Sequence, residues 1–561
     1  MRLLLILTLF SLIEFTTVAQ SLEWANKMGG PLDDSSTKIK IDDSKNVYVL
    51  GNYSGTVDFD PGSLTYNLTS NGTNDVFVCK FDSNGNFLWV IGFGGSNEDL
   101  GSGLEIDNVG NLYITGIFRN LVDFDPGVGV SHLNSQGQGD IFIAKFDQNG
   151  NFNWVKQIGS VNNEECAGIT LDYSSNIYLT GYFIFTVDFD PNPGIYNLVS
   201  TGMSDIFICN LDSSGNLNWA KNMGGTGTDI SNSICLDIDG NILTTGFYKS
   251  TSDFDPGIGF YNLNSAGAED IFVSKLDSNG NFIWAVSMGG TGKEIAFDLK
   301  SDSSSNVYLT GLFYDTGDYD PGINTSYLTP GGPSDVFVVK LNSNGSFNWA
   351  NQTTGNYDNS CSAITLGPNG NVWIAGFFGG TADFDPGPSN YSITSFGNWD
   401  IFVWELDSAG GFIMAKNYGG TQYDLGKSIV VDESDNYYLT GLFSGVANFN
   451  PPGLFTLSGN GNGDAFIAKY SNSVLNITPE NNEANGIKIY PNPFTFEFKV
   501  ECNNLFETFE LTLYNSINKV VSKNNSKCGV LFNTGLNLPN GLYYLKITSS
   551  KSTYWYKLLK I

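Results

Sequence analysis

The chain has 561 residues, of which 41% are apolar, 14% are aromatic and 66 are glycines, a composition that suits many short strands joined by tight turns. Its 57 acidic and 27 basic residues give a net charge of −30 at pH 7. This charge repels phosphate backbones and anionic lipid, so we expect no nucleic-acid partner, whereas cations or basic partners fit better. Its simplest role is to keep a large β protein soluble and its strand edges apart.

Residues 1–19 have the three parts of a secretory signal peptide. Arg2 supplies a positive charge, residues 3–13 form a short apolar run, and residues 17–19 offer a small-residue cleavage site before Gln20. The run is too short to span a membrane, and no other stretch approaches the roughly 18 apolar residues that a span needs. We therefore expect an exported protein without a transmembrane segment, either soluble or anchored by a later modification.

Two sequence features recur every 65 residues along most of the chain. The first is a tryptophan, at Trp24, Trp89, Trp154, Trp219, Trp284 and Trp349, and the next step falls on Met414. The second is an Asp-aromatic-Asp-Pro turn, which has decayed to Asn-Phe-Asn-Pro at residues 448–451 in the seventh copy. The seven copies run from about Trp24 to Ser471, and such a period predicts an array of similar structural units.

Each copy contains signals for four strands. In the second copy these are residues 103–107, 111–116, 140–145 and 152–155, with a tight hairpin turn at residues 147–151. Apolar and polar residues alternate strongly, and no helical period of useful length appears. The sequence therefore predicts an all-β fold.

Four strands in each of seven units favour a seven-bladed β-propeller over residues 20–471, because radial stacking buries the sheet faces and ring closure removes the ends. The chain begins this region with a lone copy of the outer strand, residues 22–26, and the last copy stops after its third strand, residues 464–469. We expect the N-terminal strand to complete the last blade.

The units resemble the bacterial seven-bladed β-propeller repeat family. The matching segments are residues 306–311 (Asn-Val-Tyr-Leu-Thr-Gly), 335–340 (Asp-Val-Phe-Val-Val-Lys) and 344–349 (Asn-Gly-Ser-Phe-Asn-Trp). The resemblance covers all seven copies. It implies the fold and no particular chemistry, because the family has no uniform activity.

After a polar linker at residues 472–485, residues 486–561 show new alternating strands that predict a small β-sandwich. Three landmarks stand in order: a Tyr-Pro-Asn-Pro opening, a Pro-Asn-Gly-Leu-Tyr strand and a lysine-rich last strand. They resemble the type A sorting domain of the type IX secretion system of Bacteroidota, although residues 515–519 replace the usual Asp-Gly turn. The landmark residues are Tyr490, Pro491, Asn492, Pro493, Gly541, Tyr543, Lys557 and Lys560.

The resemblance implies Sec export to the periplasm and passage across the outer membrane by the type IX machinery. Removal of the tail would follow, and then attachment to the cell surface or release. The alternative is an ordinary accessory sandwich.

Cysteine and histidine exclude several kinds of site. The seven cysteines include no CxxC motif, so neither a zinc site nor a thioredoxin-like site is expected. Cys79 and Cys209 share one repeat position and are expected in the core, as are Cys166 and Cys361. The best disulfide candidates are Cys502 and Cys528. His132 is the only histidine, which excludes Ser-His-Asp and multi-histidine metal sites, and we expect it to be an incidental loop residue.

Carboxylates are the only dense functional groups, and they form columns, meaning sets of residues at one repeat position. The Asp-x-Asp turns supply two columns, the start of the third strand supplies another, and the connection between blades supplies the last. Because the loops that hold them leave from one rim of a meander, all four should lie on one face. The connection column is Asp34, Asp99, Glu164, Asp229, Glu294, Asn359 and Asp424.

Two interpretations of the other columns remain open. The aspartates cap turns through backbone N–H groups, or they hold calcium ions, which prefer several oxygen ligands. Calcium is the only cofactor that the pattern suggests. The candidate calcium ligands are Asp58, Asp60, Asp75, Asp123, Asp125, Asp140, Asp188, Asp190, Asp205, Asp253, Asp255, Asp270, Asp318, Asp320, Asp335, Asp383, Asp385 and Asp400.

No isolated carboxylate pair stands out as catalytic, so we expect a non-enzymatic binding or adhesion module, monomeric, with a glycan or protein ligand. One alternative is an extracellular polysaccharide hydrolase or lyase, for which Glu405 is the best candidate acid, since lysine or asparagine occupies its position in the other copies. Otherwise Glu405 is a surface variation on one strand. Another alternative is a structural component of the cell envelope.

Overall fold

The computed structural model describes residues 19–451, 453–473, 487–490, 497–502, 509–515, 520–527, 531–533, 541–548 and 553–560. All regular secondary structure in these residues is β-strand. They divide into two compact units, one spanning Gln20–Asn472 and the other containing the C-terminal strands. The expected signal sequence up to residue 18 and most of the expected linker lie outside the described residues.

The larger unit is built from antiparallel groups of four strands that follow the 65-residue period. We call them repeat units 1 to 7. Unit 1 contains β2 (Ser35–Ile41), β3 (Val47–Tyr53), β6 (Asp75–Phe81) and β7 (Phe87–Gly95); unit 2 β8 (Leu100–Ile106), β9 (Leu112–Phe118), β12 (Asp140–Phe146) and β13 (Phe152–Ile158); unit 3 β14 (Glu165–Leu171), β15 (Ile177–Phe183), β18 (Asp205–Leu211) and β19 (Leu217–Gly225); unit 4 β20 (Ile230–Leu236), β21 (Ile242–Tyr248), β24 (Asp270–Leu276) and β25 (Phe282–Gly290).

The remaining units follow the same order. Unit 5 contains β26 (Glu294–Ser301), β27 (Val307–Phe313), β30 (Asp335–Leu341) and β31 (Phe347–Gln352); unit 6 β33 (Asn359–Leu366), β34 (Val372–Asp383), β35 (Ser392–Leu406) and β36 (Phe412–Gly420); unit 7 β37 (Asp424–Val431), β38 (Tyr437–Phe443), β41 (Asp464–Ser473) and β1 (Ala19–Met28).

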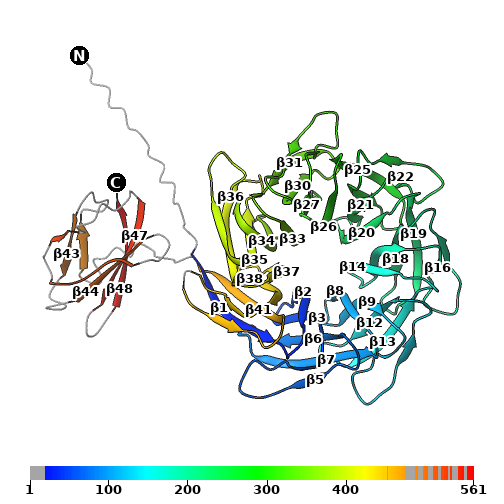
Figure 1. Ribbon diagram of the computed structural model, residues 1–561, viewed down its shortest axis with the longest axis horizontal. Coiled ribbons are helices and arrows are strands. Elements are labelled where there is room, and N and C mark those ends of the chain that lie inside the picture. The colour runs from blue at the N-terminus through cyan, green and yellow to red at the C-terminus, as the bar shows by residue number, and fades with distance from the viewer. Residues whose placement is uncertain are drawn as a thin grey trace. The chain divides into compact units, whose positions relative to one another are not determined.

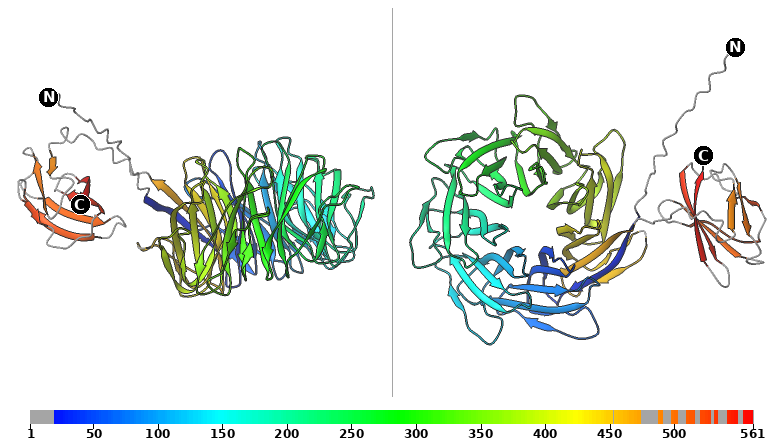
Figure 2. Two further views of the ribbon diagram at one scale, coloured as in Figure 1. Left: turned by 90° about the horizontal axis from the view of Figure 1, so that it is seen from above. Right: turned by 180° about the vertical axis from the view of Figure 1, so that it is seen from behind.

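The repeat units stand around a common central opening, with the first strand of each unit innermost (Figure 1). Figure 2 shows the same arrangement from behind. Neighbouring units pack face to face, and one buried cluster joins Tyr48 and Leu50 of unit 1 to Leu112 and Ile114 of unit 2. This packing explains why the middle strands, such as β3 and β6, are buried along almost their whole length, because another unit covers each of their faces.

The two ends of this region share one sheet. Strand β1 pairs with β41, Ser21 Oγ lies 3.0 Å from Ser471 Oγ, and Lys469 Nζ lies 2.9 Å from a carboxylate oxygen of Glu23. The inner strand β37 of unit 7 also packs against β2 of unit 1. The prediction that the N-terminal strand lies beside residues 464–469 is confirmed.

The expectation of only four strands in each copy is incomplete. The Asp-x-Asp loop is flanked by a short hairpin, which in the second copy is β10 (Leu121–Asp123) and β11 (His132–Asn134), with Val122 of β10 opposite Gly95 of the preceding unit. The equivalent strands are β4 (Thr56–Asp58), β5 (Asn67–Thr69), β16 (Thr186–Asp188), β17 (Asn197–Val199), β22 (Thr251–Asp253), β23 (Asn262–Asn264), β28 (Gly317–Asp318), β29 (Tyr327–Leu328), β39 (Val446–Asn448) and β40 (Thr456–Ser458). In unit 6 the hairpin is continuous with β34 and β35, and β32 (Thr354–Gly355) pairs beside it.

The repeated tryptophan connects each outer strand to the next unit. Trp24 Nε1 donates to the Ser83 carbonyl at 3.2 Å, and Trp284 makes the same bond to Ser343. The indole of Trp24 lies against Gly85, where a Cβ would come within 2.6 Å of the ring. Gly85 also has φ +82°, so both the turn and the indole contact require glycine at this position.

The C-terminal strands form two sheets. One contains β42 (Ile487–Tyr490), β43 (Glu497–Cys502) and β46 (Leu531–Asn533); the other contains β45 (Val520–Ser526), β44 (Phe509–Asn515), β47 (Gly541–Thr548) and β48 (Thr553–Lys560). Phe498 and Val500 of the first sheet share one buried cluster with Leu511, Leu513 and Leu545 of the second.

The expected sorting residues fall on these strands or outside the described residues. Tyr490 ends β42, Gly541 and Tyr543 begin β47, and Lys557 and Lys560 lie on β48. The Pro491–Pro493 segment lies outside the described residues. Cys528 does as well, so its predicted pairing with Cys502 stays a prediction.

Candidate functional site

The Asp-x-Asp residues act as acceptors inside their own turns. Asp58 Oδ1 accepts from the backbone N–H of Asp60 at 3.2 Å and of Tyr66 at 2.9 Å, and Asp60 Oδ1 accepts from Gly62 at 2.8 Å. The first aspartate makes the equivalent two bonds in the other copies, at Asp123, Asp188, Asp253, Asp318 and Asp383. These bonds support the turn-capping interpretation.

The seventh copy is informative because it lacks both aspartates. Asn448 Oδ1 accepts from the N–H groups of Asn450 at 3.0 Å and Phe455 at 3.2 Å, as aspartate does elsewhere. An amide oxygen is therefore sufficient for the turn. No group of three or more acidic, histidine or cysteine side chains suited to hold a metal occurs among the described residues, and calcium binding by these columns stays a prediction.

The third-strand and connection columns meet between neighbouring units, as buried junction pairs. Asp75 of unit 1 lies beside Asp99, which precedes unit 2, and the two are 0% and 1% exposed. Asp99 accepts from the N–H groups of Gly95 at 2.7 Å and Arg119 at 2.9 Å. The other pairs are Asp34 with Asp464, Glu164 with Asp140, Asp229 with Asp205, Glu294 with Asp270, and Asp424 with Asp400.

Most junction pairs contain a carboxylate oxygen without a hydrogen-bond donor. This holds for Oδ1 of Asp75, Asp140, Asp270, Asp400 and Asp464. Burial, and secondarily the neighbouring carboxylate, raises the pKa of Asp424 and Glu294 to about 7 and that of Asp99 to about 6. In unit 6 the connection residue is Asn359, whose Nδ2 donates to Asp335 Oδ1 at 2.6 Å. The amide supplies the hydrogen that a protonated acid would supply in the other pairs.

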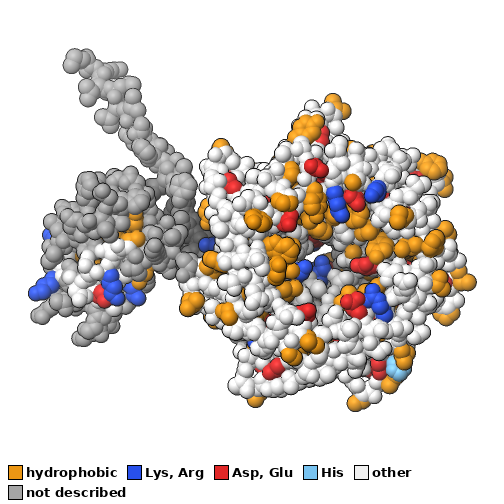
Figure 3. Space-filling model, viewed as in Figure 1, with side chains coloured by type: hydrophobic (Ala, Val, Ile, Leu, Met, Phe, Trp, Pro, Cys, Tyr) orange, Lys and Arg blue, Asp and Glu red, His pale blue; other side chains and the backbone are white. Residues whose placement is uncertain are grey.

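The central opening contains charged side chains that break the repeat. Lys40 Nζ lies 2.7 Å from Glu105 Oε1, and Lys300 Nζ lies 3.1 Å from Asp298 Oδ1. Lys38 lies near enough to Asp298 to lower the pKa of that carboxyl. These residues are on the inner strands of units 1, 2 and 5, and Figure 3 shows Lys or Arg side chains inside the opening.

Electrostatics in the opening depend on Asp298. Burial raises the pKa of Asp298, but Lys300 and Lys38 outweigh it, and the net pKa is lowered. Its carboxylate also accepts from Ser233 Oγ at 2.7 Å and from the Ile364 N–H at 3.0 Å. Burial lowers the pKa of Lys38, with Asp298 acting in the opposite direction. The cluster connects strands on different sides of the opening.

Glu405 is not a surface variation, contrary to one of the expectations. It is 4% exposed, its Oε1 accepts from Asn371 Nδ2 at 2.8 Å, and burial raises its pKa to about 7. In other units a lysine at this position lies over a tyrosine ring, as Lys80 does over Tyr48. In unit 6 Trp373 replaces that tyrosine, so the ring and the charged residue change together.

His132 lies on a strand and not in a loop. It begins β11, its side chain is 51% exposed, and Nε2 lies 3.7 Å from Asp123 Oδ2. Cys79, Cys166, Cys209 and Cys361 are buried and unpaired, which confirms the prediction that they are core residues.

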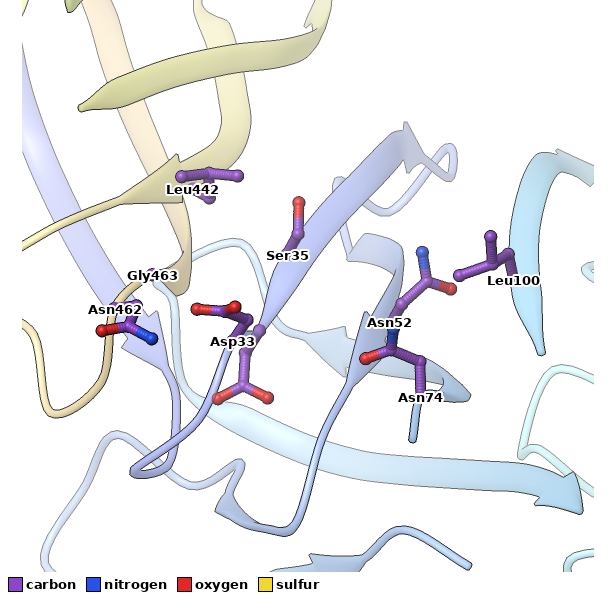
Figure 4. Close-up of a pocket in the computed structure, with 9 residues that line it drawn as sticks. Asp33, Ser35, Asn52, Asn74, Leu100, Leu442, Asn462 and Gly463 are labelled. Carbon is purple, nitrogen blue, oxygen red and sulfur yellow. The ribbon is translucent and has the colours of Figure 1, made fainter. Parts of the chain in front are cut away.

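A pocket of about 240 Å³ opens where units 7, 1 and 2 meet. Figure 4 shows Asn462 on one side, Asn52 on the other, and Asp33 and Ser35 between them. Leu100 and Leu442 contribute apolar walls. Asn52 Oδ1 accepts from the Gly101 N–H at 2.9 Å, which fixes the amide so that Nδ2 remains available.

This pocket exists because unit 1 departs from the repeat. Ser35 and Asn52 are opposite each other in the β2–β3 pair. Every other unit has at least one large side chain at the two equivalent positions. Those pairs are Leu100 with Ile117, Glu165 with Tyr182, Ile230 with Phe247, Ile295 with Leu312, Ser360 with Phe377, and Leu425 with Leu442.

Sequence reasoning did not identify this pocket or the charged cluster of the opening. The signal was present in the columns, because Asn52 stands where the other copies have a large apolar or aromatic residue. A second pocket of about 350 Å³ lies between units 2 and 3, but there Lys156 Nζ already donates to Asn192 Oδ1 at 2.7 Å, and Gln157 to Asp140 at 2.6 Å.

Family comparisons match both parts of the chain. Residues 488–560 match the model of the secretion system C-terminal sorting domain, and residues 153–182 match the beta-propeller repeat. An uncharacterized WD repeat-containing protein of Acanthamoeba polyphaga mimivirus is 22% identical over 84% of this chain and 40% of its own length. The regulatory protein FlaEY of Caulobacter vibrioides is 24% identical over 68% of this chain, again 40% of its own length.

The chain thus spans less than half the length of these two relatives. A solved structure, an extracellular domain assigned to a hybrid two component system of B. thetaiotaomicron, aligns over 96% of this chain and 99% of that one, with 11% identity and a TM-score of 0.15. No helix among the described residues is long and apolar enough to cross a membrane. The chain carries a beta-propeller repeat and, at residues 488–560, a type IX secretion sorting domain, and it is exported to the cell surface or secreted.

Proposed function

We propose that the protein is a non-enzymatic binding module: a seven-bladed β-propeller delivered outside the cell by a cleavable signal peptide and a C-terminal sorting sandwich. Its ligand is a glycan or a protein met at the cell surface. The sorting-domain match supports the location, and the pairing of β1 with β41 supports a ring of seven blades. Loops at the rim of such a scaffold are the usual positions of binding residues.

One observation carries the proposal: unit 1 departs from the repeat at Ser35 and Asn52, and the pocket that results between units 7, 1 and 2 contains polar side chains that make no hydrogen bond within the protein. The Asp-x-Asp side chains cap turns and the junction pairs bind backbone N–H groups. In contrast, Asp33 and Asn462 make no side-chain hydrogen bond. Both side chains are exposed, so a ligand that enters the pocket can reach them.

The polysaccharide hydrolase is less well supported. A glycosidase needs an acid with a raised pKa and a partner carboxylate, both facing a cleft. Glu405 has the raised pKa, but it is 4% exposed and bonded to Asn371.

The test is a glycan-array screen of the purified full chain beside a reducing-sugar release assay on the same glycans. We expect saturable binding to a subset of glycans and no release of reducing ends. Release that disappears in Glu405→Gln would contradict the proposal and favour the hydrolase. Absence of all glycan binding would restrict the ligand to a protein.

A further inference from the structure

We infer that the pocket formed by Asp33, Ser35, Asn52 and Asn462 with the Leu100 and Leu442 walls, here called the rim pocket, binds a single sugar ring through its hydroxyl groups. The inference rests on the proposed binding function and names its site and ligand class. It starts from the departure of Ser35 and Asn52 from the repeat, which opens a cavity in one unit of an otherwise regular array.

The polar groups of the rim pocket match vicinal hydroxyls. A hydroxyl both donates and accepts, a carboxylate only accepts, and an amide does both. Asp33 offers two acceptor oxygens, Asn462 an amide with both functions, and Asn52 a free Nδ2, since Oδ1 is held by the Gly101 N–H.

The apolar walls and the volume fit the same ligand. Leu100 and Leu442 offer surfaces for the C–H groups of a ring. A volume of about 240 Å³ is below the roughly 300–1,000 Å³ of sites for drug-sized ligands, so one ring fits and a longer segment must extend into solvent.

Other ligand classes fit less well. The pocket contains Asp33 and Asp34 and no lysine or arginine, so a phosphate or sulfate meets only like charge. Asp34 is committed to the N–H groups of Gly30 at 2.7 Å and Ser54 at 3.0 Å. Asp33, Ser35 and the Asn462 amide are the side chains that remain for a cation, and they supply fewer oxygen ligands than the roughly six to eight that calcium takes.

The position of the rim pocket also favours recognition of a chain end. Ser35 and Asn52 come from unit 1, Asn462 and Leu442 from unit 7, and Leu100 from unit 2. The site therefore exists only when the first and last units are joined. Asp33 and Asn462 lie in connections between strands, where a glycan outside the cell can present a terminal ring.

The deciding experiment is titration of the full chain with methyl glycosides of common hexoses and deoxyhexoses, followed by calorimetry and saturation-transfer NMR. We expect at least one glycoside to bind with a dissociation constant at or below about 1 mM. The variant Asn52→Leu installs the residue found at Leu312 and Leu442, so the fold should tolerate it, and we expect at least tenfold weaker binding.

Two further variants make the result specific. Asn462→Ala should also weaken binding at least fivefold, while Leu312→Ile, at the register of Asn52 in unit 5, should leave it unchanged. A thermal melt of each variant checks that it is folded. Unchanged glycoside binding in folded Asn52→Leu would overturn the rim pocket as the site but would leave the proposed binding function intact. If no glycoside and no arrayed glycan binds, both the sugar ligand of the pocket and the glycan as ligand in the proposed function are overturned.

Discussion

Asp253 shows what one carboxylate contributes in this repeat. Its Oδ1 accepts from the N–H groups of Asp255 at 3.0 Å and Tyr261 at 2.8 Å, the two bonds that Asn448 makes in the seventh copy. Because an amide oxygen is sufficient there, we expect Asp253→Asn to lower the free energy of unfolding by less than about 1 kcal/mol. Urea denaturation measures this difference.

The same variant separates turn capping from calcium binding. If the aspartates only cap turns, the melting temperature should be the same with calcium and with chelator, in the wild type and in the variant. Calcium-dependent heat in a titration of the wild type that is reduced in Asp253→Asn would show that the aspartates are ligands.

Asp298 is the residue on which the charged cluster of the opening depends. Replacing it by asparagine removes the ion-pair partner of Lys300. It also removes the carboxylate that most favours the charged form of Lys38. We expect the variant to lose about 1–2 kcal/mol of unfolding free energy, because Lys38 and Lys300 lose their partner carboxylate but Lys300 is 36% exposed and is screened by solvent. The matched control is Glu433→Gln, which breaks the Lys45–Glu433 ion pair at 3.1 Å on an 85% exposed side chain and should change stability by less than about 0.5 kcal/mol. Equal effects of the two variants would contradict a structural role of the cluster.

At the scale of the elements, the junction pairs predict how stability changes with pH. Folding raises the pKa of Asp34, Glu164 and Asp424 to about 7, from 3.8 for aspartate and 4.5 for glutamate. An acid whose pKa is raised by folding stabilises the folded state fully below the pKa that it has in the unfolded chain. This stabilisation is lost as the pH rises through its pKa in the folded state. The free energy of unfolding should therefore be at least about 2 kcal/mol lower at pH 8 than at pH 5. Denaturant titration across that range measures the slope, and a stability that rises from pH 5 to pH 8 would be the opposite result.

Asn359 is the internal control for this pH dependence. Asn359→Asp replaces the 2.6 Å amide donor by a second acid beside Asp335. We expect a loss of about 1–3 kcal/mol at pH 8 that is smaller at pH 5, where the new acid is protonated. The exposed turn variant Asn344→Asp should lack this pH-dependent difference. A loss of the same size at both pH values would mean that the pairs do not share a proton.

The elements also show how far sequence reasoning reached. In the second copy, the predicted strands at residues 111–116 and 140–145 agree with β9 and β12 to within two residues, because alternation and turn residues are local signals. The β10–β11 hairpin was missed, since its strands have three residues each and their pairing with Gly95 is set by the preceding unit. The junction pairs were expected on one face, but their burial depends on packing between units, which no single copy encodes.

For the whole molecule, the proposed binding function depends on how the ends of the repeat region meet. The rim pocket does not show up as an isolated pair of acids in the sequence. Its residues come from units 7, 1 and 2, and they are related only by their positions in the repeat. A site of this kind is recognised in sequence as a small polar residue where other copies have a large one. Asn52 fits that description, whereas Glu405, which replaces lysine or asparagine of the other copies, is a departure from the repeat that is buried.

The closure of the ring is the central claim, and one cross-link tests it most directly. Ser21 Oγ and Ser471 Oγ lie 3.0 Å apart although 450 residues separate them in sequence. In Ser21→Cys/Ser471→Cys, mild oxidation of the folded full chain should give a disulfide-linked monomer that migrates faster on a non-reducing gel and melts at a higher temperature than its reduced form. The pair Ser21→Cys/Ser346→Cys, with the second cysteine in unit 5, should not cross-link. Failure of the first pair to link within the monomer, or equal linking of both pairs, would contradict the account.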